Sequence, residues 1–404
     1  MAPVYDVAIV GAGLLGLAAA RSLAAQGRDF VVLEQAAIGH EGAGSKGSCR
    51  IFRLGYADPG YVTAARQALE RWRELEAQAG RPILAPTPHI TFGPDLPAVQ
   101  AAMTAAGAPC ELLPADAVAA RFPVIRVGGP ALLETQSAVI AADKALSVLA
   151  ELAGLTQPPA GLTPAGLTPS AGPAGTGGRL RTGVRVTGIA DDGRQVSLQT
   201  SDGTVTARVA IVAAGPWTAG LLGGRLTVPT TPTLEQVAYL DPAGPAEPAP
   251  IFICHGGQAP YGLPVPGSAQ YKIGMHQSGP RVSPDSQDQS PDPAMVARLA
   301  AVAERYLPGY RPGPARTERC VYDNTADEDF VLDRIGNVVV GCGTSGHGFK
   351  FGPLLGEWLA ALAGAGPAAL AADGAGPPAL GADGAGPWAR ARFSAARFGA
   401  ARSG

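Results

Sequence analysis

The apolar positions at the start of the chain form two short runs with a helix-forming segment between them. Residues 7–10 are an unbroken apolar run, and a second such run closes on Glu34. Short apolar runs bounded by turn residues are typical of buried strands, and the alanine- and leucine-rich stretch between them favours a helix. This part of the chain therefore predicts a strand, a helix and a parallel strand.

Beyond this unit the pattern alternates between helical and strand periods. Residues 61–80 and 141–154 favour helices, and residues 90–140 favour short strands with one short helix. Further strands are expected up to an apolar run at 209–215 and again at 337–342. Two helices carry apolar stripes at helical spacing, which are Ala65, Ala68, Leu69, Trp72 and Leu75 in one and Leu354, Leu355, Trp358, Leu359 and Leu362 in the other.

The chain returns twice to the pattern of its first unit, with mixed segments in between. We therefore expect an α/β fold in which a Rossmann-like nucleotide-binding domain is interleaved with a mixed-sheet substrate domain, with the site between them. The expected segments are 1–85, 141–225 and 319–362 for the first domain and 86–140 and 226–318 for the second.

Two low-complexity stretches interrupt this organisation. Residues 153–178 repeat Ala-Gly-Leu-Thr among prolines, and residues 363–404 repeat Ala-Asp-Gly-Ala-Gly-Pro before a basic end. Neither shows helical or strand periodicity. We expect the first to be a surface loop without chemistry, and the second to be a basic tail that is solvated or loosely docked.

Composition narrows the function classes. The chain has 404 residues, enough for two domains with their own cores, and a net charge of −2, which provides no overall field for nucleic acid or membrane surfaces. Its early apolar run is interrupted by glycine, unlike a signal peptide. The five cysteines are scattered without metal-ligand spacing. We expect a cytoplasmic protein with reduced thiols and no metal.

The turn after the first strand carries the pattern of a dinucleotide site. Gly11 permits a tight strand-to-helix turn, Gly13 keeps side chains away from a pyrophosphate, and Gly16 allows the helix to pack closely on the strand. Glu34 lies 18 residues after Gly16, where its carboxylate can accept both ribose hydroxyls. The alternative is an ordinary strand-helix-strand turn.

Two further clusters place cations in apolar surroundings. Arg50 and Arg53 lie in the run from Ser48 to Arg53, and arginine side chains can bind carboxylates through bidentate hydrogen bonds. The alternative is a pair of surface arginines. Lys272 and His276 share one face of an expected strand with Gly274, which suggests close approach of a flat, electron-rich group. The alternative for that strand is a solvent-facing sheet edge.

Two clusters near the C-terminal end complete the candidate chemistry. Cys320 begins the run Cys-Val-Tyr-Asp-Asn-Thr, where a small buried cysteine is the simple alternative. Gly346 and Gly348 precede Lys350 at an expected strand-to-helix junction. A helix N-terminus and a lysine can both stabilise negative charge on a bound group.

Taken together, these motifs resemble one enzyme family. The chain is similar to the monomeric sarcosine oxidase and N-methyltryptophan oxidase family of FAD-dependent amine oxidoreductases. The resemblance rests on the glycine motif, on Arg-Ile-Phe-Arg, on the run that begins at Cys320 and on Ser-Gly-His-Gly-Phe-Lys-Phe. It also rests on the spacing of 11 residues from Tyr261 to Lys272 and of 4 residues from Lys272 to His276. It extends from Tyr5 to about Leu362, apart from the low-complexity insert.

The resemblance implies roles for particular residues. Cys320 would carry FAD covalently, Arg53 and Lys350 would bind the substrate carboxylate, and Lys272 would promote the reaction with oxygen. Arg50 would lie beside the flavin ring, with Tyr261, His276 and Tyr322 lining the substrate cavity. The implied FAD contacts are Gly11, Gly13, Gly16, Glu34, Ser48, Cys320, Gly346, Gly348 and Lys350.

The implied reaction is hydride removal from the carbon next to the nitrogen of a secondary-amine or cyclic amino acid. Molecular oxygen would then be reduced, so that an imine and hydrogen peroxide result, and we expect a monomeric enzyme. A dehydrogenase with another electron acceptor and a non-catalytic FAD-binding accessory protein are the alternatives. Family members commonly have histidine where Lys46 stands and threonine where Cys49 stands, which leaves the substrate open.

Overall fold

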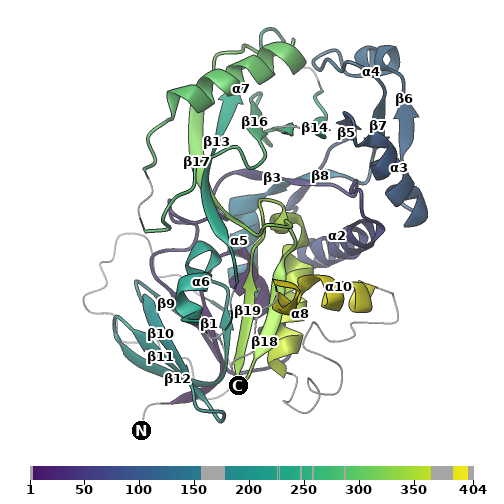
Figure 1. The fold of residues 1–404 in the computed structure, drawn as a ribbon. Helices are drawn as coiled ribbons and strands as arrows, with labels where there is room; N and C mark the ends of the chain where they lie inside the picture. The colour runs from purple at the N-terminus through teal and green to yellow at the C-terminus, as the bar shows by residue number, and fades with distance from the viewer. Residues whose placement is uncertain are drawn as a thin grey trace. The chain divides into compact units, whose positions relative to one another are not determined.

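The computed structural model describes residues 3–155, 178–224, 226, 228–245, 248–256, 259–285, 288–364 and 385–398. The chain divides into two units (Figure 1), of which the first comprises 1–45, 145–231 and 323–404 and the second 46–144 and 232–322. The expected interleaving of two α/β domains is confirmed. The first boundary differs from the expected one, because residues 46–85 belong to the second unit, where β3 (Cys49–Phe52) pairs with β8 (Ala138–Ala141).

The first unit is built on an eight-stranded sheet. Strand β1 lies between β2 and β12, and all three are parallel, as are β9 beside β2 and β19 beside β12. Strands β10, β11 and β18 pair antiparallel at the margins. The bounds are β1 Val4–Val10, β2 Phe30–Glu34, β9 Gly178–Thr182, β10 Val186–Asp191, β11 Val196–Thr200, β12 Gly203–Val212, β18 Val331–Ile335 and β19 Val338–Cys342.

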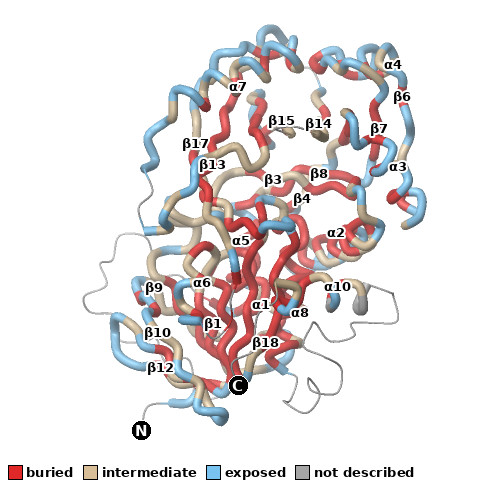
Figure 2. Tube along the Cα trace, viewed as in Figure 1, coloured by how far each residue is buried: buried red, intermediate tan, exposed pale blue. Residues whose placement is uncertain are grey.

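Helices complete this unit and pack against its buried strands, as Figure 2 shows for β1 and α1. The sequence patterns correctly predicted α5 and α8, as well as β19. The helical bounds are α1 Leu14–Ala25, α5 Ala142–Leu152, η1 Gly215–Trp217, α6 Thr218–Leu222, η2 Gly348–Phe351, α8 Gly352–Gly364, α10 Ala385–Phe393 and η3 Ala395–Phe398.

Gly16 of α1 shows why a glycine is required where helix and strand pack. A Cβ atom at this position would lie 1.9 Å from the carbonyl oxygen of Gly11. We therefore expect Gly16→Ala to lower the free energy of unfolding by about 1–3 kcal/mol, the usual cost of overpacking a core. Urea denaturation measures this change. Gly220→Ala is the matched control, because a Cβ atom there meets nothing within 4 Å, and a comparable loss in that variant would contradict the explanation.

The second unit contains a mixed eight-stranded sheet in the order β17-β13-β16-β15-β14-β5-β7-β6, and a three-stranded sheet, β3-β8-β4. Strands β14 and β5 are parallel, whereas β15 pairs antiparallel with β14 and β16. The bounds not yet given are β4 Leu84–Pro86, β5 His89–Phe92, β6 Glu111–Leu113, β7 Ala131–Glu134, β13 Thr231–Leu240, β14 Ile251–Cys254, β15 Pro260–Pro264, β16 Tyr271–Met275 and β17 Arg316–Asn324.

Helix α2 (Pro59–Ala79) matches the predicted amphipathic helix and begins two residues before the expected start. Asp58 caps it, accepting hydrogen bonds from the backbone N–H groups of Gly60 and Tyr61. Gly80 ends it with a φ of 62°, a left-handed conformation that glycine adopts without strain. The unit's other helices are α3 Leu96–Ala105, α4 Ala115–Arg121 and α7 Pro293–Tyr306. None of the helices in the described part of the chain combines the length and apolar character that a membrane crossing requires.

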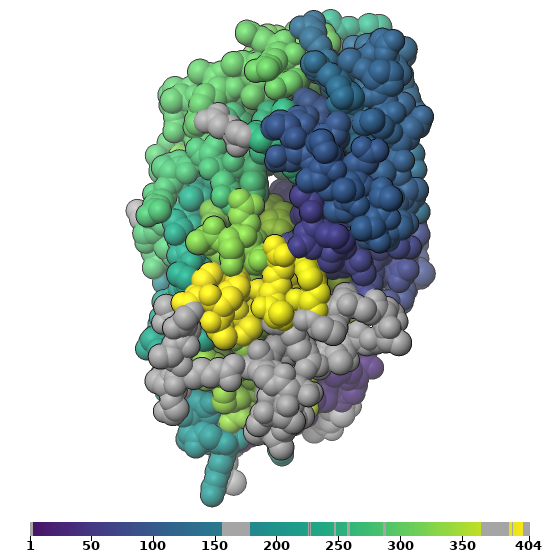
Figure 3. Space-filling view, turned by 45° about the vertical axis from the view of Figure 1, so that its right-hand side comes forward, coloured from purple at the N-terminus to yellow at the C-terminus, as the bar shows by residue number. Residues whose placement is uncertain are grey.

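The C-terminal segment α10–η3 is packed on the first unit, in contrast to the expected solvated or loosely docked tail. It is the yellow segment in Figure 3. Phe393 is buried, and the Arg392 Nε atom lies 2.7 Å from both carboxylate oxygens of Asp329. Arg397 pairs with Asp327 at 2.7 Å. Aromatic burial and ion pairing therefore fix this segment, whereas most of the expected surface loop at 153–178 lies outside the described residues.

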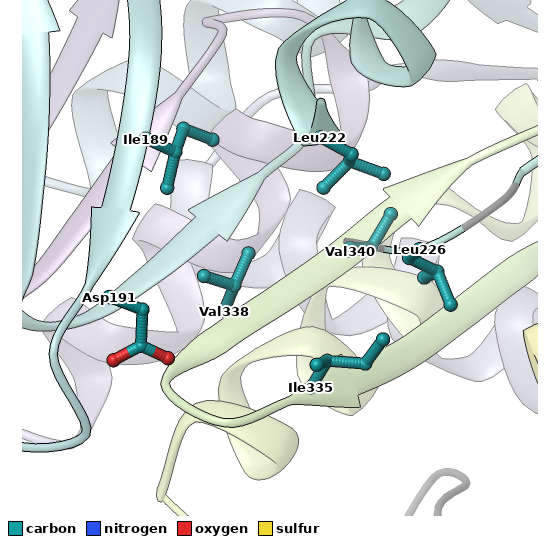
Figure 4. A pocket seen from close by; sticks show the side chains of 7 residues that line it. All are labelled: Ile189, Asp191, Leu222, Leu226, Ile335, Val338 and Val340. Carbon is teal, nitrogen blue, oxygen red and sulfur yellow. The ribbon is translucent and has the colours of Figure 1, made fainter. Parts of the chain in front are cut away.

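A pocket in the first unit is too small to be a substrate site. Its volume is about 30 Å³, well below the roughly 300 Å³ at which small-molecule sites begin. Figure 4 shows apolar side chains and Asp191 around it. Asp191 is already engaged, because its carboxylate accepts hydrogen bonds from the backbone N–H and the side-chain amide of Asn337 at 2.8 and 3.1 Å. We interpret this pocket as a packing gap.

Candidate functional site

The glycine turn of the first unit has the geometry of a phosphate-binding loop. Gly11 has a φ of 100°, and a Cβ atom there would lie 2.5 Å from the carbonyl oxygen of Ala213. A Cβ atom at Gly13 would have only the Ser45 hydroxyl within van der Waals contact, at 3.4 Å. The approach to the N-terminus of α1 is therefore free of side-chain bulk, as a pyrophosphate requires. Ser45, which sequence reasoning missed, also accepts a hydrogen bond from Leu14 N–H at 3.1 Å.

Glu34 lies at the end of β2 beside this turn. Its carboxylate is buried and accepts hydrogen bonds from Ala12 N–H at 2.8 Å and Ala36 N–H at 3.0 Å. His40 Nε2 lies 3.6 Å from the same carboxylate. The backbone thus fixes the carboxylate beside the glycine turn. A fixed acceptor at this place fits FAD, whose ribose hydroxyls would donate to it.

A second loop of the first unit carries Gly346, Gly348 and Lys350. Asp323 holds its start, because the carboxylate accepts from Gly343 N–H at 2.7 Å and the carbonyl accepts from Ser345 N–H at 3.0 Å. The Lys350 side chain is buried and donates to the carbonyl of His347 at 2.8 Å. A buried ammonium group is therefore placed at the junction of η2 and α8, as expected.

The second unit gathers several of the predicted residues from different strands. Lys272 on β16 donates to the carbonyl of Cys49 on β3 at 3.3 Å. The hydroxyls of Tyr261 on β15 and Tyr322 on β17 lie 3.4 Å apart. The ring of His276 lies 5.9 Å from that of Tyr322, between centroids. Residues from four strand regions thus form one cluster around Cys320 and Arg50.

Burial and the neighbouring charges together set the pKa values in this cluster. Burial lowers the pKa of Lys272, and the charge of Arg50 lowers it further. Burial raises the pKa of the Cys320 thiol, although Arg50 and Lys272 oppose that change. Burial lowers the pKa of Arg50, but the interactions with Cys320, Cys49, Tyr322 and Tyr261 together raise it above the usual value. The cluster is therefore a dry, cationic environment that favours negative charge on a bound group.

Strand β16 clarifies the expected face of Lys272, Gly274 and His276. The strand lies between β13 and β15 and is buried along its length, which excludes the alternative of a solvent-facing edge. A Cβ atom at Gly274 would lie 2.4 Å from the hydroxyl oxygen of Tyr261. The flat group that approaches this glycine is therefore the side chain of Tyr261, and His276 lies just past the end of the strand.

Arg53 is buried in the second unit, so for this residue the alternative of a surface arginine is wrong. Its guanidinium carbon lies 4.1 Å from the centre of the Tyr56 ring. Among the described residues, its Nη1 atom has no hydrogen-bond partner and is shielded from solvent. A buried guanidinium N–H without a partner is costly unless a ligand satisfies it. Arg53 therefore has the character of an anion receptor.

Three further groups near this cluster had no signal in the sequence patterns. The Tyr239 hydroxyl donates to Glu318 at 2.7 Å, and the ring of Tyr239 lies 5.5 Å from Lys272 Nζ. Burial opposes ionisation of Glu318, but the hydrogen bond from Tyr239 and the charge of Lys272 hold its pKa below the usual range. His255 is half-buried, and its pKa is lowered to about 3 by removal of the imidazole from water and by the charge of Arg53.

Ser48 joins the same network as a hydroxyl partner. Its oxygen lies 3.5 Å from the hydroxyl oxygen of Tyr239, and Cys49 and Arg50 follow it on β3. Arg50 is tied down locally, because it donates to the carbonyl of Cys49 at 2.9 Å and to that of Lys46. Thus Lys46 and Cys49, which depart from the family pattern, both contribute backbone atoms to the cluster.

Comparison with known proteins agrees with this chemistry. The family model described as FAD dependent oxidoreductase matches residues 6–362. The chain is 32% identical to mouse (Mus musculus) peroxisomal sarcosine oxidase, covering 88% of this chain and 91% of that protein. It is 30% identical to monomeric sarcosine oxidase of Bacillus sp. (strain B-0618), covering 89% and 92%.

A solved structure is also similar to this chain. The open form of NikD, an unusual amino acid oxidase essential for nikkomycin biosynthesis, is similar with a TM-score of 0.76 and 25% identity, covering 89% of this chain and 93% of that one. Glycine oxidase from Geobacillus kaustophilus, at a TM-score of 0.73 and 19% identity, shares the fold.

Proposed function

We propose that this chain is a flavoprotein oxidase of secondary-amine or cyclic amino acids. It belongs to the family of FAD dependent oxidoreductases. The products are an imine and hydrogen peroxide, with oxygen as the second substrate. The buried cationic cluster of Lys272 and Arg50 beside Cys320 is the observation that carries this proposal. The relatives named sarcosine oxidase, and NikD as an amino acid oxidase, support the substrate class.

FAD binding is proposed for two groups of residues. Gly11, Gly13, Gly16 and Glu34 would hold the pyrophosphate and ribose, and the remaining proposed contacts are Ser48, Cys320, Gly346, Gly348 and Lys350. When bound, FAD supplies an acceptor for hydride and a donor of electrons to oxygen. We also propose a covalent bond between FAD and Cys320. Burial raises the pKa of this thiol on β17, but Arg50 and Lys272 oppose that rise and would stabilise the thiolate during attachment.

Substrate binding is assigned to two buried cations. Arg53 Nη1 has no hydrogen-bond partner among the residues with a described position, which supports a role in holding the substrate carboxylate. Lys350 is proposed as the second ligand of that carboxylate. Holding the carboxylate orients the carbon that is to lose hydride. Tyr261, Tyr322 and His276 would line the substrate cavity, and their tyrosine hydroxyls stay neutral because burial raises the pKa of both phenols.

A monomeric enzyme in a reducing compartment such as the cytoplasm completes the proposal. All five cysteines are unpaired, as reducing conditions favour. The similar bacterial oxidases that carry the word monomeric in their names support the oligomeric state.

A substrate panel tests the function. We expect hydrogen peroxide release with N-methyl or cyclic amino acids and much less with the same amines lacking the carboxyl group, because Arg53 then has no anion to bind. Peroxide is measured with a coupled peroxidase assay on the purified holoenzyme, and a heat-denatured sample is the control. Two outcomes would favour the alternatives. Anaerobic reduction by substrate with slow reoxidation in air indicates a dehydrogenase, and no reduction by any member indicates an accessory protein.

A further inference from the structure

Glu134 is a buried carboxylate of the second unit that lies outside the cluster described above. It is the last residue of β7 and pairs across the sheet with His89, the first residue of β5. Only 2% of its surface and none of that of His89 is exposed. A buried carboxylate needs several hydrogen bonds to offset the loss of water, so its partners reveal its role.

The partners of Glu134 lie directly beside Arg53 in the chain. The carboxylate accepts hydrogen bonds from Leu54 N–H at 3.1 and 3.2 Å and from Gly55 N–H at 2.9 Å. His89 Nδ1 lies 2.9 Å from its other side, which fixes the carboxylate's orientation. Glu134 therefore immobilises the two peptide groups that follow Arg53.

The Arg53 side chain is held at its outer end as well. The guanidinium stacks on Tyr56 at 4.1 Å, and the Tyr56 ring stacks on Tyr61 with centroids 5.0 Å apart. Backbone and side chain are thus both restrained, while Nη1 is buried and has no hydrogen-bond partner in the part of the chain that the structure describes. Such restraint lowers the entropy that anion binding costs.

We propose that Glu134 is a positioning residue for Arg53, whose guanidinium it holds in the orientation that receives a substrate carboxylate. The inference rests on the proposed function, because it takes Arg53 as the carboxylate ligand. It extends that function by explaining selectivity for amines that bear a carboxyl group. Glu134 does not touch the substrate and acts only through the peptide groups of Leu54 and Gly55.

The substitution Glu134→Gln tests this inference in the holoenzyme. The glutamine amide has the shape of the carboxylate, but its NH₂ group faces a backbone N–H that needs an acceptor. The peptide group after Arg53 therefore becomes less firmly held. We expect the dissociation constant of acetate, a plain carboxylate probe, to rise about ten-fold, equivalent to about 1.4 kcal/mol. The flavin absorption spectrum reports acetate binding. With dimethylamine, which has no carboxyl group, kcat/KM should not change.

Glu76→Gln is the matched control. Glu76 also accepts two backbone N–H groups, from Ile83 at 2.6 Å and Leu84 at 2.7 Å, but it does not adjoin Arg53 in the chain. Its substitution should leave acetate affinity unchanged. The proposal is wrong if Glu134→Gln binds acetate like the wild type, or if it lowers kcat/KM equally for substrates with and without a carboxyl group.

Arg53→Met separates this inference from the proposed function. If Arg53→Met leaves acetate binding intact, the carboxylate role of Arg53 fails. If Arg53→Met abolishes acetate binding, the residual affinity for N-methylated amino acids is measured in a double-mutant cycle. In the Arg53→Met background, adding Glu134→Gln should cause no further loss of that affinity. An equal further loss overturns the positioning role.

A measurement on the wild type covers the case in which Glu134→Gln does not fold. Hydrogen exchange at Leu54 and Gly55 should already be slow without acetate, and acetate should change it little. Exchange that slows strongly only on adding acetate would contradict a preformed receptor.

Discussion

Replacing Cys320 with alanine will release the flavin when the protein is precipitated with acid, whereas the wild-type precipitate will remain yellow. The expected difference is nearly complete, because a covalent bond either survives denaturation or does not exist. Cys320 lies on β17, and the charges of Arg50 and Lys272 oppose the rise in thiol pKa that burial causes. These cations reduce the cost of ionising the thiol, although burial still keeps its pKa above the usual value.

The measurement is the flavin absorbance of pellet and supernatant after acid precipitation. Cys254→Ala is the matched control, because Cys254 is also a half-buried cysteine of the second unit without a disulfide bond. It lies on β14 opposite Phe92 of β5, and three strands separate β14 from β17 in the sheet. The variant should retain the coloured precipitate. Loss of all flavin from the wild-type precipitate would refute the covalent bond, while non-covalent FAD binding would still stand.

The sequence predicted the elements whose physical causes are local. The glycine turn needs no side chain at Gly13 and a positive φ at Gly11, and only glycine meets both needs. Helix α2 was predicted from its apolar stripe, and the Asp58 cap and the terminal glycine that the structure adds are equally local. Elements with such local causes can be predicted from the sequence without knowledge of the rest of the fold.

The parts that were not predicted depend on contacts between distant segments. Glu134 looks like an ordinary acid at the end of a strand, and its meaning depends on Leu54 and Gly55, about eighty residues earlier. The pairing of Tyr239 with Glu318 likewise joins positions 79 residues apart. No periodicity encodes such pairs, because the sheet order that brings them together is a property of the whole unit.

The C-terminal segment illustrates a different limit. Its glycine- and alanine-rich composition gives no apolar stripe, and the sequence therefore indicated a loose tail. Phe393 and Arg392 nevertheless anchor it, one by burial and one by pairing with Asp329. A few strong contacts are enough to fix a segment whose average composition favours disorder.

Replacing Lys272 with methionine will slow the reaction of the reduced enzyme with oxygen by about 10²–10³-fold, the usual cost of removing one preorganised charge from a dry site. Lys272 is buried, donates to the Cys49 carbonyl at 3.3 Å and lies 5.5 Å from the Tyr239 ring, so its ammonium group is held in place. It would stabilise the negative charge that oxygen gains with its first electron. Reduction by substrate should slow far less, because the proposed substrate ligands are Arg53 and Lys350 and not Lys272.

Stopped-flow spectroscopy measures the two half-reactions separately, with Lys144→Met as the control for loss of an exposed lysine. The pH dependence gives a second check. Burial and Arg50 lower the pKa of Lys272, so the protonated form is lost as pH rises through a value below that of an ordinary lysine. The wild-type oxygen rate should therefore fall with rising pH in that range, and the Lys272→Met rate should not follow this decline. If both half-reactions slow equally, Lys272 acts on the fold or the substrate and its assignment to oxygen is wrong.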